Sequence, residues 1–219
     1  MKKSLKLVLK RLPIYWSIRN WRNKRRQAGD VAAWEAKGCP VPPPHIIKQR
    51  TLLEYAATHN LQIFVETGTF LGDMIEAMRG SFESLFSIEL DNALCNMAKS
   101  RFRRRDHIQI VNGDSAKVLG DIVRSIDRPA LFWLDGHYSG GVTARGLKDT
   151  PVLEELKIIL DAPDRGHVII IDDARCFGKD CDYPTIEALG LLVGSMRDNM
   201  TVTVRDDMIR VTPAKPPIS

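Results

Sequence analysis

Apolar runs and amphipathic stretches alternate along the chain from about Ile46 onward. The apolar runs are short, which is typical of strands buried on both faces, and they cover 63–65, 85–88, 108–111, 130–134 and 168–171. Between them the apolar positions recur at helical spacing, which predicts helices over 72–79, 92–104, 115–126, 151–160 and 183–196. The pattern therefore predicts an α/β protein with a mostly parallel sheet that is doubly wound, with helices on both faces.

Local signals define the ends of this pattern. Thr150 stands where an N-cap is expected, and Pro151 takes the first helical position after it. Near the C-terminus, residues 201–205 and 208–212 form two short β-type runs separated by two aspartates. These two runs predict a closing hairpin.

The first 45 residues follow a different pattern. Apolar residues at helical spacing predict a short amphipathic helix over 5–12, and Pro13 interrupts it. Aromatic and basic residues then interleave, and residues 38–45 form a proline-rich linker. We therefore divide the chain into a basic helical extension with its linker, 1–45, and a folded domain, 46–219.

The formal net charge of +5 is the sum of two unlike parts. Residues 1–29 hold ten Lys and Arg and no acid, whereas residues 30–219 carry a net charge of −5. Three interpretations of the basic extension remain open: peripheral contact with an anionic membrane through residues 1–29, a nucleic-acid arm, or a helix packed on its own domain or on a partner.

Cysteine usage and hydropathy bear on the compartment. Four irregularly spaced cysteines with no C-x-x-C pair favour neither a disulfide framework nor structural zinc. The N-terminus begins like a signal peptide, but Lys6 and Lys10 interrupt its apolar stretch, and no run approaches the about 20 residues of a membrane span. We expect a cytoplasmic protein, membrane-peripheral if residues 1–29 bind lipid.

Acidic residues stand at or directly after the ends of the five predicted strands. They are Glu66, Glu89, Asp114, Asp135, Asp172 and Asp173. In open α/β sheets ligands bind beyond the carboxyl ends of the strands. We therefore expect these six acids to line one crevice.

The loop after the first strand contains glycines that permit a tight turn. Gly68 and Gly72 in the segment 66–72 match neither G-x-G-x-x-G nor a P-loop, which disfavours classical dinucleotide binding and nucleotide hydrolysis. Glu89 follows 17 residues after Gly72, where an acid could accept both ribose hydroxyls of an adenosine. Asp114 and Ser115 stand where a third strand end could contact adenine.

Together these residues resemble the class I S-adenosylmethionine-dependent methyltransferases over about residues 63–212. The motif Glu66-Thr67-Gly68-x-x-x-Gly72 is similar to the family's first motif, which holds the methionine part of the cofactor. Glu89 matches the ribose-binding acid, and Asp114 with Ser115 matches the adenine-side position. The resemblance implies a Rossmann-like sheet of seven strands with a C-terminal antiparallel hairpin.

The segment after the fourth strand lacks the Asn/Asp-Pro-Pro-Tyr/Phe and Pro-Cys motifs of enzymes that methylate base or glutamine nitrogens and cytosine carbon, which disfavours a nucleic-acid substrate. It resembles the metal-dependent O-methyltransferases of the catechol, caffeoyl-coenzyme A and macrocin type. That resemblance assigns Asp135, Asp172 and Asp173 to a Mg²⁺ ion, which takes hard oxygen ligands. Alternatively Arg145, Lys148 or Arg175 neutralises the three acids and no metal binds.

The same segment supplies the candidate base. A histidine side chain has an unperturbed pKa of about 6.5, which suits proton removal at neutral pH, so His137 is the candidate base, although it could instead ligate the ion or stabilise the loop. Tyr138 stands where the catechol-type enzymes carry a catalytic lysine. The glycine-rich residues 139–149 are typical of a lid over the acceptor.

The sequence thus predicts an enzyme that transfers a methyl group to a hydroxyl of a small molecule, a sugar or a glycan precursor. An RNA or protein methyltransferase using the basic extension, and a non-catalytic cofactor-binding protein, are the alternatives. The oligomeric state is left open. We expect the domain to fold and to bind cofactor without residues 1–29.

Overall fold

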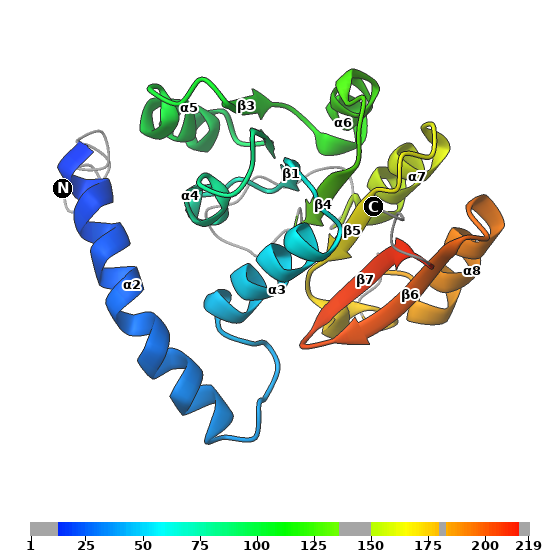
Figure 1. The fold of residues 1–219 in the computed structure, drawn as a ribbon, viewed down its shortest axis with the longest axis horizontal. Coiled ribbons are helices and arrows are strands. Elements are labelled where there is room, and N and C mark those ends of the chain that lie inside the picture. The colour runs from blue at the N-terminus through cyan, green and yellow to red at the C-terminus, as the bar shows by residue number, and fades with distance from the viewer. Residues whose placement is uncertain (1–12, 136–149, 180–182, 215–219) are drawn as a thin grey trace.

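The computed structural model describes residues 13–135, 150–179 and 183–214. At its centre is a seven-stranded sheet with the strand order β3-β2-β1-β4-β5-β7-β6 (Figure 1). The strands are β1 (Ile63–Thr67), β2 (Ser84–Glu89), β3 (Ile108–Asn112), β4 (Ala130–Leu134), β5 (Val168–Ile171), β6 (Met200–Arg205) and β7 (Met208–Pro213). The helices are α2 (Pro13–Glu35), α3 (His45–Thr58), α4 (Asp73–Met78), α5 (Asn92–Phe102), α6 (Ser115–Ser125), α7 (Val152–Asp161), α8 (Ile186–Met196) and the 3₁₀ turn η1 (Ala174–Cys176).

The direction of the strands confirms the predicted α/β class. Strands β1 to β5 pair in parallel, whereas β7 runs antiparallel to β5 and forms an antiparallel hairpin with β6. The strand order reverses between β1 and β4, so the crevice at their carboxyl ends is the topological switch point where such folds bind ligands.

The two faces of the sheet bury separate apolar cores. Helices α6, α7 and α8 cover one face with side chains such as Leu119, Leu156 and Leu189, and helices α3, α4 and α5 cover the other. Every residue of β1, β4 and β5 is buried, which explains the unbroken apolar runs of β4 and β5 and the apolar residues 63–65 at the start of β1.

Three predicted helix starts shift in the structure, and the first is α4, which begins at Asp73 because Gly72 is its N-cap. Helix α7 begins at Val152 rather than Pro151, although the Thr150 hydroxyl still accepts the Val152 N–H at 3.3 Å. Helix α8 begins at Ile186 rather than Tyr183, because Thr185 caps it by accepting the Ala188 N–H at 3.1 Å. Pro184 disfavours the helical conformation at Tyr183, and this was the overlooked signal.

The part of the extension that the structure describes forms one long helix along an edge of the molecule (Figure 1). Near its start Trp16 is buried against Leu71 and Leu94 of the domain, so this part of α2 packs on the domain. The helix predicted over 5–12 lies outside the described residues. None of the helices in the described ranges is long and apolar enough to cross a membrane. The division at residue 45 stays a prediction, and α3 begins there.

Candidate active site

Glu66 lies inside β1 rather than beyond its end, and its carboxyl group is buried. The Ser87 hydroxyl on the neighbouring strand donates to Glu66 Oε2 at 2.5 Å, and it lies 2.6 Å from Thr69 Oγ1. Burial raises the pKa of Glu66 well above its ordinary range, despite the bond from Ser87. Glu66 and Ser87 therefore link the carboxyl end of β1 to β2 and fix the start of the loop that follows.

That loop leaves the sheet with two glycines in the left-handed region. Gly68 has φ 85° and donates its N–H to Ile88 O at 2.9 Å, while Gly72 has φ 73° and caps α4. A Cβ atom on Gly72 would stand 2.7 Å from the Phe102 ring. Thr67, the last residue of β1, accepts the Asp135 N–H at its carbonyl (3.2 Å). The loop thus needs glycine at position 72 for both its turn and its packing.

Glu89 ends β2 and faces this loop. Its Oε2 accepts the Phe70 N–H at 2.7 Å and its Oε1 accepts the Asp91 N–H at 2.9 Å. A carboxylate has about four lone-pair positions, so each oxygen can accept one further hydrogen bond. Burial raises the pKa of Glu89, and the two backbone N–H groups oppose that rise. The carboxylate is therefore held in place with accepting capacity left for two hydroxyls.

Asp114 and Ser115 lie at the turn from β3 to α6. Asp114 caps α6 by accepting the Ala116 N–H at 3.2 Å, and Lys117 Nζ lies 3.3 Å from its other oxygen. Ser115 is buried beside Glu155 of α7. Glu155 is a residue of this site that the sequence reasoning missed. Burial raises the pKa of Glu155 to about 7, and Ser115 and Thr67 partly offset the rise. Glu155 faces the core from an otherwise apolar helix side, and that position in the helical pattern was the available signal.

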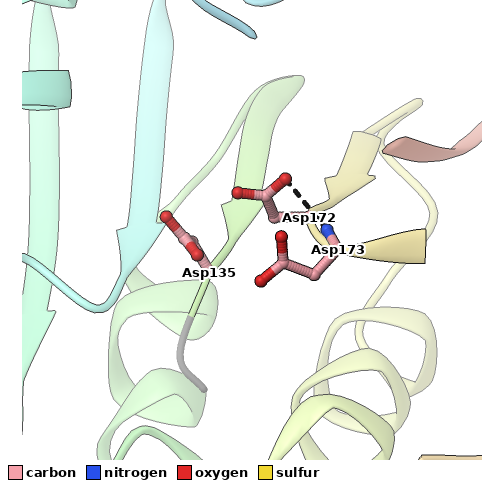
Figure 2. Close-up of side chains that lie close together, drawn as sticks. All are labelled: Asp135, Asp172 and Asp173. Carbon is pink, nitrogen blue, oxygen red and sulfur yellow. Dashed lines mark hydrogen bonds between the residues drawn. The ribbon is translucent and has the colours of Figure 1, made fainter. Parts of the chain in front are cut away.

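Asp135, Asp172 and Asp173 come together beyond the ends of β4 and β5, as predicted. The register pairs Leu134 with Ile171, so the residues that follow lie side by side. One carboxylate oxygen from each aspartate lies within 4.8 Å of the others, and Figure 2 shows the three side chains around a common space. Asp172 Oδ1 accepts the Asp173 N–H at 2.9 Å, and the Asp173 backbone is in the left-handed region (φ 58°).

Two cations reach this cluster from outside the strand ends. Lys48 of α3 forms an ion pair with Asp172, and its Nζ lies 3.9 Å from Asp173 Oδ1. Arg175 donates to Asp173 Oδ1 at 2.6 Å and also pairs with Asp207 in the turn between β6 and β7. The sequence reasoning considered Arg175 but missed Lys48, because Lys48 arrives from a helix that precedes the whole sheet.

The cluster remains crowded with negative charge even with these cations present. Burial and the neighbouring Asp135 raise the pKa of Asp172 to about 7, although Lys48 opposes the rise. A divalent cation would relieve this repulsion, and three carboxylate oxygens are the ligands that Mg²⁺ prefers. The donor set therefore fits the metal, with Lys48 as a competing cation that has to turn away from Asp172 to free that carboxylate.

Helix α2 supports the loop between β1 and α4. Arg19 Nε lies 3.2 Å from both oxygens of Asp73, and Arg101 of α5 donates to Asp73 Oδ1 at 2.9 Å. The Arg101 guanidinium also donates to Leu71 O and lies 4.2 Å from the centre of the Trp16 ring. The extension thus holds the residues that follow the glycine turn.

The candidate base, two candidate cations and the predicted lid all belong to the segment 136–149. His137, Tyr138, Arg145, Lys148 and the predicted lid 139–149 lie outside the described residues. His45, the first residue of α3, is exposed, with Nδ1 2.7 Å from Gln49 Nε2. It lies one helical turn before Lys48.

Comparisons with known proteins identify the fold. No family model matches the sequence, and no curated protein matches it either. Among solved structures, the chain is similar to the O-methyltransferase TomG from Streptomyces achromogenes, involved in tomaymycin synthesis and bound to SAM, with 16% identity, a TM-score of 0.56 and coverage of 85% of this chain and 87% of that one. It is also similar to an O-methyltransferase from Bacillus cereus in complex with SAH (13% identity, TM-score 0.58, 85% and 89% covered). A third is the SAH-bound methyltransferase PaMTH1 from Podospora anserina (14% identity, TM-score 0.52, 76% and 77% covered).

These likenesses confirm the predicted fold, a Rossmann-like methyltransferase sheet with its C-terminal hairpin. At such low identity they define the fold alone.

Proposed function

We propose that the protein is an S-adenosylmethionine-dependent O-methyltransferase acting on a small molecule, a sugar or a glycan precursor, with Mg²⁺ as a second cofactor. The observation that carries the proposal is the convergence of Asp135, Asp172 and Asp173 at the switch point, directly beside the loop 66–72. The solved structures that share this fold include O-methyltransferases bound to SAM and SAH, which supports the choice of cofactor.

The cofactor half of the proposal uses the β1 and β2 ends. The glycine turn at Gly68 and Gly72 lets the methionine part of the cofactor approach the backbone closely. Glu89 accepts the two ribose hydroxyls with the lone pairs that Phe70 and Asp91 leave open. Asp114 and Ser115 border the adenine, with Asp114 also capping α6.

The acceptor half uses the three aspartates. Mg²⁺ held by them would supply Lewis-acid activation of the acceptor hydroxyl and fix its position. The chain's own contribution is to orient that hydroxyl in line with the sulfonium methyl group, which is the geometry that displacement requires. Arg175 and Asp207 keep Asp173 in its position on the cluster.

The acceptor hydroxyl must lose its proton as the methyl group arrives. We assign this proton to His137, two residues after Asp135, with Tyr138 at the position of the catechol-type lysine. A His137→Gln variant should keep cofactor affinity and lose the rise in rate between about pH 6 and 7.5 that an imidazole base produces.

The deciding experiment separates cofactor binding from metal binding. SAM and Mg²⁺ are each titrated by calorimetry into the wild-type protein and into Asp135→Asn. We expect SAM affinity to change by less than about twofold and Mg²⁺ affinity to fall at least about tenfold. Asp161→Asn, an exposed aspartate at the end of α7, is the matched control and should behave as wild type in both titrations.

Transfer is then measured as SAH release with catechols, phenols and nucleotide sugars as acceptors. Asp135→Asn should abolish transfer, and excess EDTA should do the same until Mg²⁺ is restored. Full activity in EDTA would exclude the metal, and loss of SAM binding in Asp135→Asn would show that the acids are wrongly divided between cofactor and metal.

A further inference from the structure

Helix α2 has two opposite faces, and the domain packs against only one of them. Trp16 and Val31 on the inner face are buried. Ile14, Ile18 and Trp21 are 65%, 51% and 54% exposed, and their spacing of four and three residues places them in one stripe on the opposite side of the helix. Figure 1 shows α2 along one edge of the molecule, with the domain on one side of it.

The stripe is unusual among the described residues. The other exposed large apolar side chains are spread over separate segments, namely Val41, Phe70, Leu90, Leu191 and Val204. Single exposed apolar residues are common on soluble proteins, whereas several in one stripe indicate an interaction surface.

Basic side chains border the same stripe. Arg22 and Arg25 are exposed on the outer side of α2, and the Arg25 guanidinium lies 4.1 Å from the centre of the Trp21 ring. Lys24 and Arg26 are exposed on the flanks of the helix. The surrounding sequence is of one sign, since residues 1–29 contain ten basic residues and no acid.

We propose that the outer face of α2 docks the protein on an anionic lipid surface. A helix with an apolar stripe flanked by arginines lies in the membrane interface, with its apolar side chains among the acyl chains and its guanidinium groups among the headgroups. Tryptophan is enriched at that depth. This proposal does not depend on the proposed methyl transfer, and it adds a second property of the protein.

Two other occupants fit the surface less well. A nucleic-acid backbone would pair with the arginines but would leave Ile14 and Ile18 without apolar contact. A second copy of the chain would need about 800 Å² on each partner for a stable dimer, and three side chains offer much less. Lipid satisfies both the apolar stripe and the charge.

Docking would also position the candidate active site. The inner face of α2 contacts Leu71 and Asp73 in the loop that follows the glycine turn. A helix is about 10 Å across, so the outer face would hold this loop about one helix diameter from the lipid headgroups.

Co-sedimentation of the full-length protein with vesicles tests the proposal. Vesicles of phosphatidylcholine alone are compared with vesicles of phosphatidylcholine and phosphatidylglycerol in equal parts. The wild-type protein should sediment with the anionic vesicles only, less so at high salt. The double variant Ile18→Ser/Trp21→Ser should reduce partitioning at least about tenfold, and Arg22→Glu/Arg25→Glu should do the same.

Matched controls carry the same changes on other surfaces. Leu191→Ser/Val204→Ser removes two exposed apolar side chains, and Arg124→Glu/Lys157→Glu reverses two exposed charges on α6 and α7. Both should partition as wild type. Tryptophan emission should shift to the blue with anionic vesicles, and the Trp21→Ser variant should lose most of the shift.

Three results would overturn the proposal. The first is outer-face variants that sediment like wild type, which would assign any lipid binding to other residues. The second is equal sedimentation with both kinds of vesicle. The third is a dimer or an RNA complex of the wild-type protein, seen by light scattering or gel shift, that the outer-face variants abolish while vesicles bind neither form.

Discussion

His167 is a buried side chain directly before β5. Its Nδ1 accepts the Ala130 N–H at 3.1 Å, and its ring stands edge-on to Phe132 at 5.1 Å between centroids. The bond from Ala130 requires an unprotonated Nδ1. Burial lowers the pKa of His167 to about 4, so the folded protein keeps the imidazole neutral at pH values where the unfolded chain protonates it.

This difference predicts a loss of stability in acid. Between the unfolded pKa near 6.5 and the folded pKa near 4, the unfolded chain binds the extra proton, so the free energy of unfolding falls as the pH falls. From pH 7 to pH 4 the loss from His167 alone should reach about 3 kcal/mol. Urea unfolding at several pH values measures it.

Two buried acids act in the opposite direction over the same range. Asp172 and Glu155 each have a folded pKa near 7, so their protonation favours the folded state as the pH falls. Only a comparison with His167→Asn, whose amide oxygen can accept the Ala130 N–H, isolates the histidine. A variant with the same pH dependence as wild type would contradict the assignment.

Glu89 should contribute to cofactor affinity through its charge. Replacing it by Gln leaves one oxygen acceptor and one NH₂ donor where the backbone N–H groups of Phe70 and Asp91 both donate. Hydrogen bonds to a charged group contribute about 1.5–3 kcal/mol, so SAM affinity should fall about tenfold to hundredfold. Calorimetry measures the change, and Glu83→Gln on an exposed position should leave affinity as in wild type.

At the scale of elements, the two glycines Gly72 and Gly190 offer a matched pair. Gly72 has φ 73° and its Cβ would meet the Phe102 ring, whereas Gly190 lies within α8 with nothing near its Cβ position. Gly72→Ala should lower the free energy of unfolding by about 1–3 kcal/mol and weaken SAM binding. Gly190→Ala should raise the free energy of unfolding by up to about 1 kcal/mol.

Thermal or urea unfolding of both variants, with SAM titration, checks this pair. Equal effects of the two substitutions would show that the turn at Gly72 tolerates a side chain. It would also remove the argument that the backbone there approaches a ligand closely.

The arrangement of strands and helices explains which parts of the site could be predicted from the sequence. Acids after apolar runs were predictable, because parallel strands align their carboxyl ends and so bring Asp135 and Asp172 together. Lys48 was not, because nothing local in α3 indicates that it reaches β5 across more than 100 residues of chain. The burial of Glu155 was predictable in principle from its place on the apolar side of α7. The later start of α8 was predictable too, because Pro184 disfavours the helical conformation at Tyr183.

At the scale of the whole molecule, the basic extension that the sequence separates from the domain forms a helix with two faces in different environments. The basic extension was considered as a packed helix, a membrane contact or a nucleic-acid arm. The inner face of α2 packs Trp16 against Leu71 and Leu94, while the outer face exposes apolar and basic side chains. Packing and docking are therefore compatible, because they use opposite sides of the same element.

Deleting residues 1–29 tests how far the domain depends on this helix. The two apolar cores on either side of the sheet contain no residue of α2, so the truncated chain should fold with a cooperative unfolding transition. The truncated chain loses the packing of Trp16 on Leu71, and it also loses the Arg19–Asp73 ion pair. The loop after the glycine turn should then be less ordered, and SAM affinity should fall about tenfold, as ordering the loop on binding costs about 1–2 kcal/mol per residue.

A point variant separates the two contributions of the helix. Trp16→Ala removes the inner contact but keeps the outer face, so it should reproduce most of the loss of SAM affinity while vesicle binding stays within about twofold of wild type. Circular dichroism and calorimetry on both proteins provide the measurements. A truncated chain that fails to fold would make α2 part of the domain core, and unchanged SAM affinity in both proteins would show that the loop holds its conformation through Arg101 alone.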